Sequence, residues 1–248
     1  NIGSCYGKKM MQNHTYILYE KIITTILLVF VIGLADAKAD DLALYGGITS
    51  DSTLRGISQS VGKSRLQFSL DWNHPNGIFL GSKISVGEPA GKMNRKGEYY
   101  LYAGYFSPIG KTAALEFSLA YYGYDGDFPR SWNYLELRSD YHIDKELSMS
   151  LSYTDDYYGR GKENIHASIN WQPKIFDNIY GLLMIGNTYM PDSVYASRIK
   201  NYNVGIITSF DRWNFQLGYY YADKEAEIIH GSDTAGGRLA IEINYAIF

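Results

Sequence analysis

Cysteine is nearly absent from this sequence, which has a single copy, Cys5, in 248 residues. Cys5 lies upstream of the part that we expect to remain after export, so the mature chain is predicted to have neither a disulfide nor a thiolate nucleophile. An excess of basic residues is also missing, because the formal net charge is −3. No nucleic acid is expected as a partner, since proteins that bind one present a basic face.

Proline is scarce, whereas glycine and tyrosine are abundant, with 25 and 24 copies. A mean hydropathy of −0.24 argues against a bundle of membrane-spanning helices. Aromatic residues and glycine with little proline favour strands. Proline cannot donate a hydrogen bond to a sheet. We therefore expect all six prolines in connections or at strand limits, namely Pro75, Pro89, Pro108, Pro129, Pro173 and Pro191.

The N-terminal region has the features of an export signal. An apolar run covers residues 22–34, lysines precede it at positions 8, 9 and 21, and two small-x-small sites follow within residues 35–39. We predict that residues 1–39 form an N-terminal extension and signal peptide that is removed, which leaves residues 40–248 as one barrel domain. An uncleaved anchor is the alternative, although the run is short for a helix that spans a bilayer.

The rest of the sequence alternates between apolar and polar residues, as strands with two different faces do. For example, Leu66, Phe68 and Leu70 alternate with Gln67 and Ser69. The pattern predicts about twelve strands of about ten residues, the length that a tilted strand needs to cross a bilayer. These strands are expected near residues 41–50, 63–72, 77–87, 97–106, 112–122, 131–141, 145–155, 163–172, 176–188, 199–209, 212–222 and 236–248.

The predicted connections alternate in length. Long ones are expected at 51–62, 88–96, 123–130, 156–162, 189–198 and 223–235, and short ones at 73–76, 107–111, 142–144, 173–175 and 210–211. Outer-membrane barrels have long loops outside and short turns in the periplasm. The predicted fold class is therefore all-β, a transmembrane antiparallel up-and-down β-barrel in the outer membrane of a Gram-negative cell. A soluble barrel with an apolar core remains the alternative.

Aromatic residues near strand ends are expected to form girdles at the two membrane interfaces, where they would meet outer-membrane lipids and lipopolysaccharide. They are Trp72, Tyr99, Tyr105, Tyr121, Tyr153, Trp171, Trp213 and Tyr245. The chain ends on Phe248. A terminal aromatic residue after an amphipathic strand is typical of proteins delivered to the outer-membrane insertion machinery, although Phe248 is out of phase with the apolar residues before it.

The polar face of the strands carries charged residues that are costly to bury unless they are paired or hydrated. The candidates for lining a pore are Asp71, Lys83, Glu98, Glu116, Glu136, Arg138, Asp140, His166 and Glu242. Twelve strands give a lumen between that of filled eight-stranded barrels and that of wide porins. We expect a narrow pore with an acidic excess that favours cations or small neutral solutes. Cross-strand pairs around Glu136 and Arg138 that plug the barrel are the alternative.

The segment from Asp51 to Gly62 is the strongest candidate for a functional loop. Its polar residues are expected to fold into the mouth and narrow it; they are Arg55, Gly56, Ser58, Gln59 and Ser60. The competing interpretation is that they only set the register of the first hairpin. The stretch Tyr157-Tyr158-Gly159-Arg160-Gly161 is expected at a loop tip, where it is available to a partner.

The sequence around this loop resembles the TorF family of porins, also known as the Gcw family of conserved proteobacterial proteins. The resemblance is carried by residues 47–63, which include Thr49-Ser50-Asp51 and Arg55-Gly56-Ile57-Ser58-Gln59-Ser60, and by Asn76-Gly77-Ile78-Phe79-Leu80-Gly81 and Tyr102-Ala103-Gly104-Tyr105. It is specific over about residues 41–106. It implies an outer-membrane barrel that conducts solutes, with no catalytic residues.

Motifs for enzymes are weak, and we predict no catalytic, metal or cofactor site. Gly110-Lys111-Thr112 lacks the earlier glycine of a phosphate-binding loop, because Tyr105 stands at that position. His166 and Ser168 share a face but lie within a polar strand face. Passive diffusion of small solutes or ions is thus the predicted function. A barrel that does not conduct and acts as an adhesin or structural protein through its long loops is the alternative.

Overall fold

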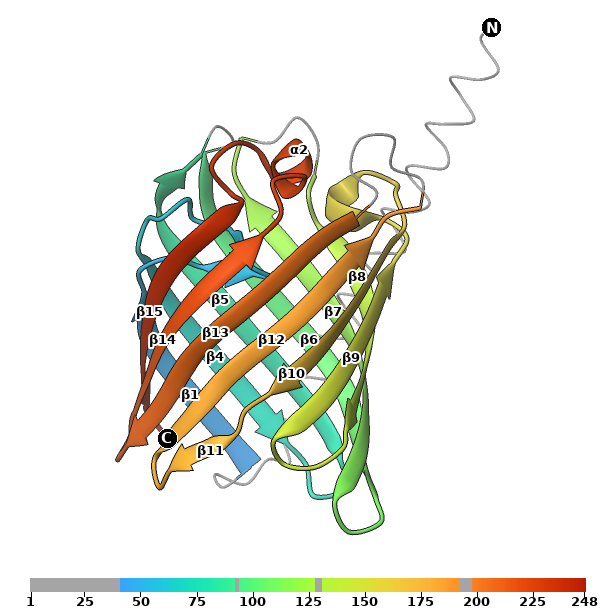
Figure 1. The fold of residues 1–248 in the computed structure, drawn as a ribbon, viewed down its shortest axis with the longest axis vertical. Helices are drawn as coiled ribbons and strands as arrows, with labels where there is room; N and C mark the ends of the chain where they lie inside the picture. Colours follow the sequence, from blue (N-terminus) through green and yellow to red (C-terminus); the bar gives the residue numbers. More distant parts are fainter. Residues whose placement is uncertain (1–40, 92–93, 128–130, 192–197) are drawn as a thin grey trace, which may run out of the picture. The chain divides into compact units, whose positions relative to one another are not determined.

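The computed structural model describes residues 41–91, 94–127, 131–191 and 198–248. The predicted extension and signal peptide, residues 1–39, lie outside the described residues. Twelve long strands form the wall (Figure 1). They are β1 (Leu42–Thr49), β4 (Arg65–Asn73), β5 (Ile78–Ala90), β6 (Arg95–Ile109), β7 (Ala113–Asp125), β8 (Tyr134–His142), β9 (Leu147–Thr154), β10 (Asn164–Trp171), β12 (Ile179–Tyr189), β13 (Arg198–Phe210), β14 (Trp213–Ala222) and β15 (Gly236–Ala246).

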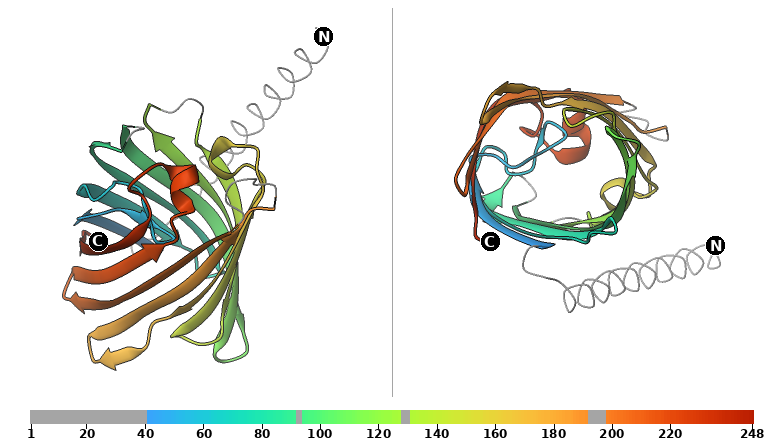
Figure 2. Two further views of the ribbon diagram at one scale, coloured as in Figure 1. Left: turned by 45° about the horizontal axis from the view of Figure 1, so that its top comes forward. Right: turned by 90° about the horizontal axis from the view of Figure 1, so that it is seen from below.

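The wall is a closed barrel in which each strand pairs antiparallel with its neighbours in the sequence. Closure comes from the first and last strands, because β1 pairs with β15 from Tyr45↔Ala246 to Thr49↔Glu242. Seen along the barrel, the strands form a complete ring (Figure 2). The short β11 (Lys174–Phe176) only extends the pairing of β12 at one end. The predicted up-and-down barrel of twelve strands is confirmed.

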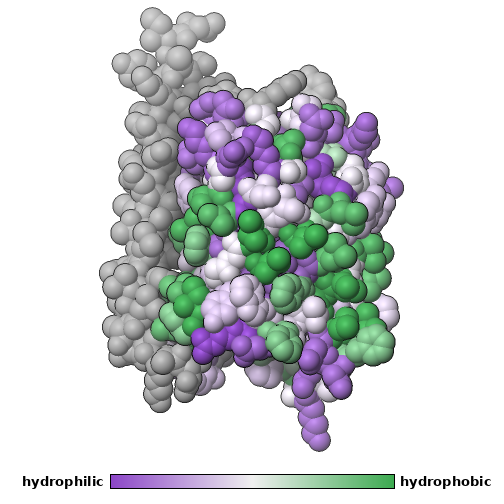
Figure 3. Space-filling view, turned by 90° about the vertical axis from the view of Figure 1, so that its left-hand side faces the viewer, coloured by the Kyte–Doolittle hydropathy of each residue, from purple (hydrophilic) through white to green (hydrophobic). Residues whose placement is uncertain are grey.

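The two faces of each strand differ as the alternation predicts. In β4, Leu66 and Phe68 are 52% and 50% exposed on the outside, whereas Gln67 between them is 4% exposed. On the face drawn in Figure 3, hydrophobic residues form a band with hydrophilic residues above and below it. An apolar belt around a polar interior is what a bilayer requires of a barrel. Among the described residues, no helix has the length and hydropathy needed to span a membrane.

The aromatic girdle is only partly as predicted. Tyr99, Tyr105, Tyr153, Trp171 and Trp213 are exposed, and Tyr245 is partly exposed. Trp72 and Tyr121 are instead buried. Trp72 lies 5.5 Å from the ring of His74, and Tyr121 lies 6.0 Å from the ring of Tyr99.

Two prolines lie within strands, contrary to the prediction. The pairing of β5 with β6 extends to Ala90↔Arg95, so the connection predicted at 88–96 is much shorter. Pro89 is accommodated because the register shifts between Val86 and Ala90, which leaves irregular pairing there. Pro108 pairs with Ala114 of β7, but β5 does not reach it, since that pairing ends at Tyr105. Pro108 therefore lies on a local edge, where its missing N–H has no effect.

The long connections contain most of the remaining secondary structure, and they gather at one end of the barrel (Figure 1). They hold the two-residue strands β2 (Thr53–Leu54) and β3 (Ile57–Ser58), the 3-10 helix η2 (Tyr157–Gly159) and the helix α2 (Ala226–His230). The other end has short turns, such as the two residues between β13 and β14. It also has the start of β1 and the end of β15, where Leu44 N–H donates to the carbonyl of Phe248 at 3.0 Å.

Candidate functional site

The connection between β1 and β4 folds into the barrel. β2 and β3 form a small hairpin in which Thr53 pairs with Ser58 and Leu54 with Ile57. The tip is Arg55-Gly56, and both residues have positive φ, 53° and 73°. A Cβ on Gly56 would lie 2.2 Å from the carbonyl oxygen of Tyr221, so only glycine allows this close approach to β14. Figure 2 shows the hairpin inside the ring of strands.

Arg55 at the tip forms an ion pair with Glu136 on β8. Its Nη2 lies 2.6 and 2.7 Å from the two carboxylate oxygens and 2.8 Å from Oγ of Ser152 on β9. Glu136 is only 1% exposed. Burial acts to lower the pKa of Arg55, but the combined effect of Glu136 and of the nearby tyrosines outweighs it and raises that pKa well above its ordinary value. Arg55 is therefore charged and its charge is neutralised inside the barrel.

Asp51 anchors the base of the hairpin. One of its carboxylate oxygens accepts hydrogen bonds from Ser58 and Ser60 at 2.5 and 2.7 Å. The other accepts one at 3.0 Å from Arg238 of β15. The hairpin is thus held at both its base and its tip by charged groups, which give the strongest hydrogen bonds.

Two further contacts attach the hairpin to β6. Ser52 Oγ donates to Glu98 at 2.5 Å, and Arg95 donates to the side-chain oxygen of Gln59 at 3.1 Å. A backbone bond of 2.8 Å from Ser58 N–H to the carbonyl of Thr234 joins it to the connection between β14 and β15. The hairpin therefore contacts the barrel wall at β6, β8 and β15, so it crosses the lumen.

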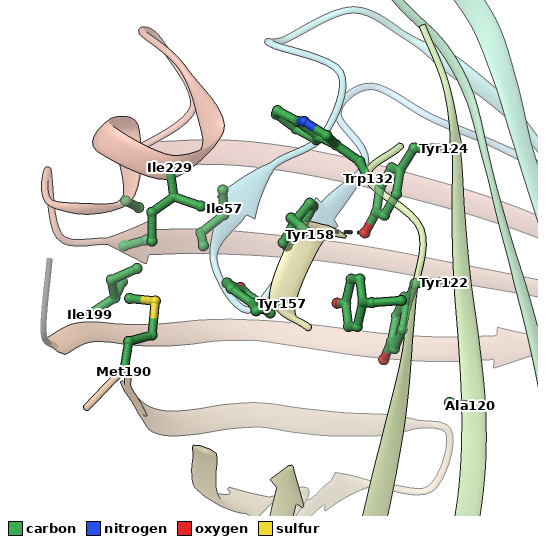
Figure 4. Packing of buried hydrophobic residues seen from close by; sticks show 13 residues of the cluster. Ile57, Ala120, Tyr122, Tyr124, Trp132, Tyr157, Tyr158, Met190, Ile199 and Ile229 are labelled. Atoms are coloured by element: carbon green, nitrogen blue, oxygen red, sulfur yellow. Dashed lines mark hydrogen bonds between the residues drawn. The ribbon is translucent and has the colours of Figure 1, made fainter. Parts of the chain in front are cut away.

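An aromatic and aliphatic cluster surrounds the hairpin at the long-loop end (Figure 4). Ile57 comes from the hairpin, Tyr157 and Tyr158 from η2, and Ile229 from α2, and all four are buried. Tyr124 of β7 lies 3.1 Å from Tyr158, hydroxyl to hydroxyl, and burial raises the pKa of Tyr158 to about 12. We call residues 51–62, 157–159 and 226–230 the plug. It corrects the prediction of a free loop tip at 157–161, because Tyr157 and Tyr158 are packed inside.

His230 lies within the plug, among rings and cations. Its ring is 4.5 Å from that of Tyr158 and 5.9 Å from that of Tyr157, edge to face in both cases. Neither ring nitrogen has a hydrogen-bond partner among the described residues. Burial, followed by the positive charges of Arg95, Arg160 and Arg55, lowers its pKa well below the ordinary value. His230 is therefore neutral in the closed plug.

A polar space remains on the other side of the plug. Two adjoining cavities of about 280 and about 140 Å³ share Gln67, Lys83 and Glu242 in their walls. Asp71 lines the larger one, and Asp51 and Ser52 of the hairpin line the smaller one. The smaller cavity therefore ends at the plug.

The charged residues predicted for the lumen fall into three groups. Asp71, Lys83 and Glu242 line the cavities. Glu98 and Glu136 bind the hairpin. The others contact wall residues: Arg138 pairs with Asp140 at 2.6 Å, Glu116 lies 3.6 Å from His142, and His166 lies 2.9 Å from Thr188.

The mouth-loop residues all lie in the hairpin, and Arg55, Ser58, Gln59 and Ser60 each make side-chain bonds there. Sequence reasoning missed Arg238 and His230, and it treated Asp51 only as the start of the loop. Arg238 was detectable, because it alternates with the apolar residues Leu239 and Ile241 and so lies on the polar face of β15. His230 was not, because its role depends on which connections meet in space. His166 contacts Thr188 rather than Ser168, and no metal-binding group occurs among the described residues.

Solved structures of outer-membrane porins share this fold. The KdgM porin is 12% identical, with a TM-score of 0.52, and the match covers 84% of this chain and 99% of that one. The NanC porin is 11% identical, with a TM-score of 0.52, and covers 83% and 98%. A KdgM porin in complex with disordered oligogalacturonate has a TM-score of 0.50 at 12% identity, covering 84% and 99%. At such identities, the likeness establishes the fold alone.

No curated protein matches the chain in sequence. A family described as bacterial proteins of unknown function, Gcw_chp, matches residues 39–243. This range includes the hairpin, the charged wall and most of β15, and the chain therefore belongs to the Gcw_chp family.

Proposed function

We propose that this chain is a gated outer-membrane channel for small solutes or ions, closed by the plug in the state described above. The observation that carries the proposal is a polar, charged interior with an open cavity, inside a closed barrel whose outside is apolar. A wall of this kind is expected where water fills part of the lumen. The proposal agrees with the TorF-type porin resemblance.

The orientation follows from the same logic. The plugged end, with the long connections, faces the outside, and the short turns and both ends of the barrel face the periplasm. Cleavage of residues 1–39 during export belongs to this proposal, as does recognition of β15 and Phe248 by the insertion machinery. Lipids and lipopolysaccharide would cover exposed apolar residues such as Leu137 and Leu239, which are 60% and 69% exposed.

Opening requires the hairpin to leave the lumen. Arg55 and Glu136 would then separate and be hydrated, which replaces a buried ion pair with two solvated charges. The desolvation that opposes a buried ion pair offsets much of its attraction. The ion pair therefore adds only a modest net energy to the closed state, but loss of either partner leaves the other charge buried and unpaired, which should shift the balance towards the open channel.

The charges left along the cavity set the preference for solutes. Two carboxylates, Asp71 and Glu242, and one ammonium group, Lys83, line the larger cavity. A cavity with this acidic excess attracts cations and disfavours anions. Although one similar structure contains oligogalacturonate, a polyanion is not the expected solute here. The charged wall instead favours cations and small neutral or zwitterionic molecules.

Single-channel recordings of refolded residues 40–248 in a planar bilayer test the proposal. Two variants are informative: one deletes residues 55–60, and the other replaces them with six glycine and serine residues, which keeps the length of the connection. We expect rare or small steps from the unmodified barrel and frequent, cation-selective steps from both variants. A change in electrophoretic mobility on heating would verify that each barrel is folded.

A non-conducting adhesin or structural barrel is the second candidate, and the dense packing of the plug favours it. Tyr134, Tyr157 and Tyr158 are each no more than 2% exposed, so this end of the lumen resembles a protein core. The two candidates differ in the plug variants. Silence from both variants, with folding verified, would reject the channel and leave the long connections as the functional surface.

A further inference from the structure

The cavity below the plug has polar groups that lack partners. Gln67 is 4% exposed, and its side-chain oxygen has no hydrogen-bond partner among the described residues. This residue lines both parts of the cavity. A buried amide oxygen without a donor is costly, so a group that donates a hydrogen bond to it would bind favourably. The position of Gln67 therefore points to a ligand with a donor.

Opposite charges line the same space, and the described residues include no ion pair between them. Asp71, Lys83 and Glu242 all border the larger cavity. In the described part of the chain, Lys83 makes no ion pair within 4.0 Å and no side-chain hydrogen bond. All three charged groups therefore border one space of about 280 Å³.

Asp71 and Glu242 each accept a hydrogen bond at one carboxylate oxygen, which holds the carboxylate in place. Tyr102 donates a hydrogen bond to one oxygen of Asp71, and Asn244 donates to one oxygen of Glu242 at 2.7 Å. Among the described residues, the second oxygen of each carboxylate accepts no hydrogen bond within 3.5 Å and is available to a donor. Both acids can therefore accept from a ligand while their orientation is maintained by the barrel.

A glycine in β1 makes room for this arrangement. Gly47 pairs with Asn244, and a Cβ on Gly47 would lie 2.0 Å from the side-chain oxygen of Asn244. The amide of Asn244 therefore packs directly on the backbone of β1 and directs its nitrogen to Glu242. Gly47 belongs to the sequence stretch that continues into the hairpin, so one segment supplies both the plug and the support of this wall.

We propose that this cavity binds small zwitterionic solutes, with Lys83 contacting the carboxylate of the solute and Asp71, Glu242 and Gln67 contacting its ammonium group. The inference rests on the proposed channel function and names its solute class. Simple anions meet two carboxylates, and simple amines leave Lys83 without a partner. A neutral polyol satisfies Gln67 but gains nothing from the separated charges. Free amino acids combine both charges within the available volume.

Four solutes with one carbon skeleton separate these possibilities: L-alanine, L-lactate, alaninol and propane-1,2-diol. Their binding to the refolded, detergent-solubilised barrel of residues 40–248 is measured by ligand-observed NMR titration. We expect alanine to bind at least tenfold more tightly than each of the other three. K83M should lower alanine affinity to that of alaninol, and E242Q should lower it while retaining the contact with Asn244.

The matched control is K174M, which removes a lysine that is half exposed on β11, away from the cavity. It should leave alanine binding unchanged. Equal affinity for all four solutes, no alanine binding to a verified folded barrel, or unchanged binding in K83M would overturn the inference. Because equilibrium binding does not require conduction, recordings from the variant lacking residues 55–60 judge the channel separately. Steps without alanine binding would leave the channel and remove the zwitterion site.

Discussion

Arg55 and Glu136 are 81 residues apart in the sequence, yet their side chains form an ion pair of 2.6 Å inside the barrel. Arg55 occupies the tip of a hairpin and Glu136 the inner face of β8, so the pair joins the hairpin to the barrel wall. A buried charge left without its partner is costly. A single substitution in this pair should therefore change the balance between the closed and the open channel.

Replacement of Arg55 with alanine should favour the open state. It leaves Glu136 buried without a counter-charge in the closed barrel, a loss of about 3–5 kcal/mol, whereas in the open barrel Glu136 can be hydrated. We expect single-channel steps to become frequent in R55A. The double variant R55A/E136Q removes both charges and should return most of the closed time. Equal conductance of R55A and the unmodified barrel would show that the ion pair does not hold the hairpin.

Gly56 supplies a steric test of the same hairpin. In G56A the new methyl group would meet the carbonyl of Tyr221 at 2.2 Å, and the backbone has a φ of +73°. Strain of this kind costs about 1–3 kcal/mol for the backbone alone, and the clash adds to it. The hairpin should be displaced, so trypsin should cleave after Arg55 several-fold faster than in the unmodified barrel.

Gly62 provides the matched control for that experiment. It has the same φ of +73°, but a Cβ there would have no heavy atom within 4 Å. G62A therefore carries the backbone cost without the clash at β14. Faster cleavage in G56A but not in G62A would assign the effect to the approach to Tyr221, whereas equal rates would show that the clash is unimportant.

Acid should open the plug through His230. Its pKa is lowered in the closed plug by burial and by Arg95, Arg160 and Arg55, and it should return towards about 6.5 when the residue is hydrated. The open state then binds more protons between the two pKa values, so closure is complete above pH 6.5 and weakens as the pH falls below it. The ratio of open to closed channels should rise by up to roughly tenfold per pH unit.

Conductance between pH 8 and pH 5 measures this effect. H230F keeps a ring among Trp132, Tyr157 and Tyr158 but cannot be protonated, so its conductance should lose most of the pH dependence. His74 lies in a turn at the opposite end of the barrel, and H74F should keep the pH dependence of the unmodified chain. A response that survives in H230F would assign acid sensitivity to another group.

The barrel was predictable from the sequence because strand alternation is local. Leu66 and Gln67 differ in polarity, and that difference alone determines which of them faces outward. The plug was only partly predictable. Polar residues at 55–60 indicated a loop that enters the mouth, but the partners of Arg55 and Asp51 depend on strands far along the chain. Tyr157 and Tyr158 looked like an exposed loop tip, because nothing local shows that η2, α2 and the hairpin meet.

The ends of the strands were also difficult to predict from the sequence. Proline is a good marker of a strand boundary only when both neighbouring strands reach it. Pro108 lies in β6 beyond the last pair that β6 forms with β5, so its lack of an N–H has no consequence there. The length of a strand relative to its neighbours is a property of the whole barrel and its stagger, and it cannot be read from one segment.

A pair of lysine substitutions tests the assignment of faces on which every proposal above depends. Leu137 is 60% exposed and alternates with the buried Glu136, so L137K places a charge on the surface expected to face lipid. Such a charge near the middle of a bilayer costs about 2–4 kcal/mol, whereas substitutions in a hydrated lumen are tolerated. Ser168 of β10 is in register with Ser150 of β9, on the face that points into the lumen. In folding titrations with urea in lipid vesicles, L137K should lose several-fold more stability than S168K. Equal losses would mean that the outer belt is not in contact with lipid, and the barrel would then have to be reconsidered as a soluble one.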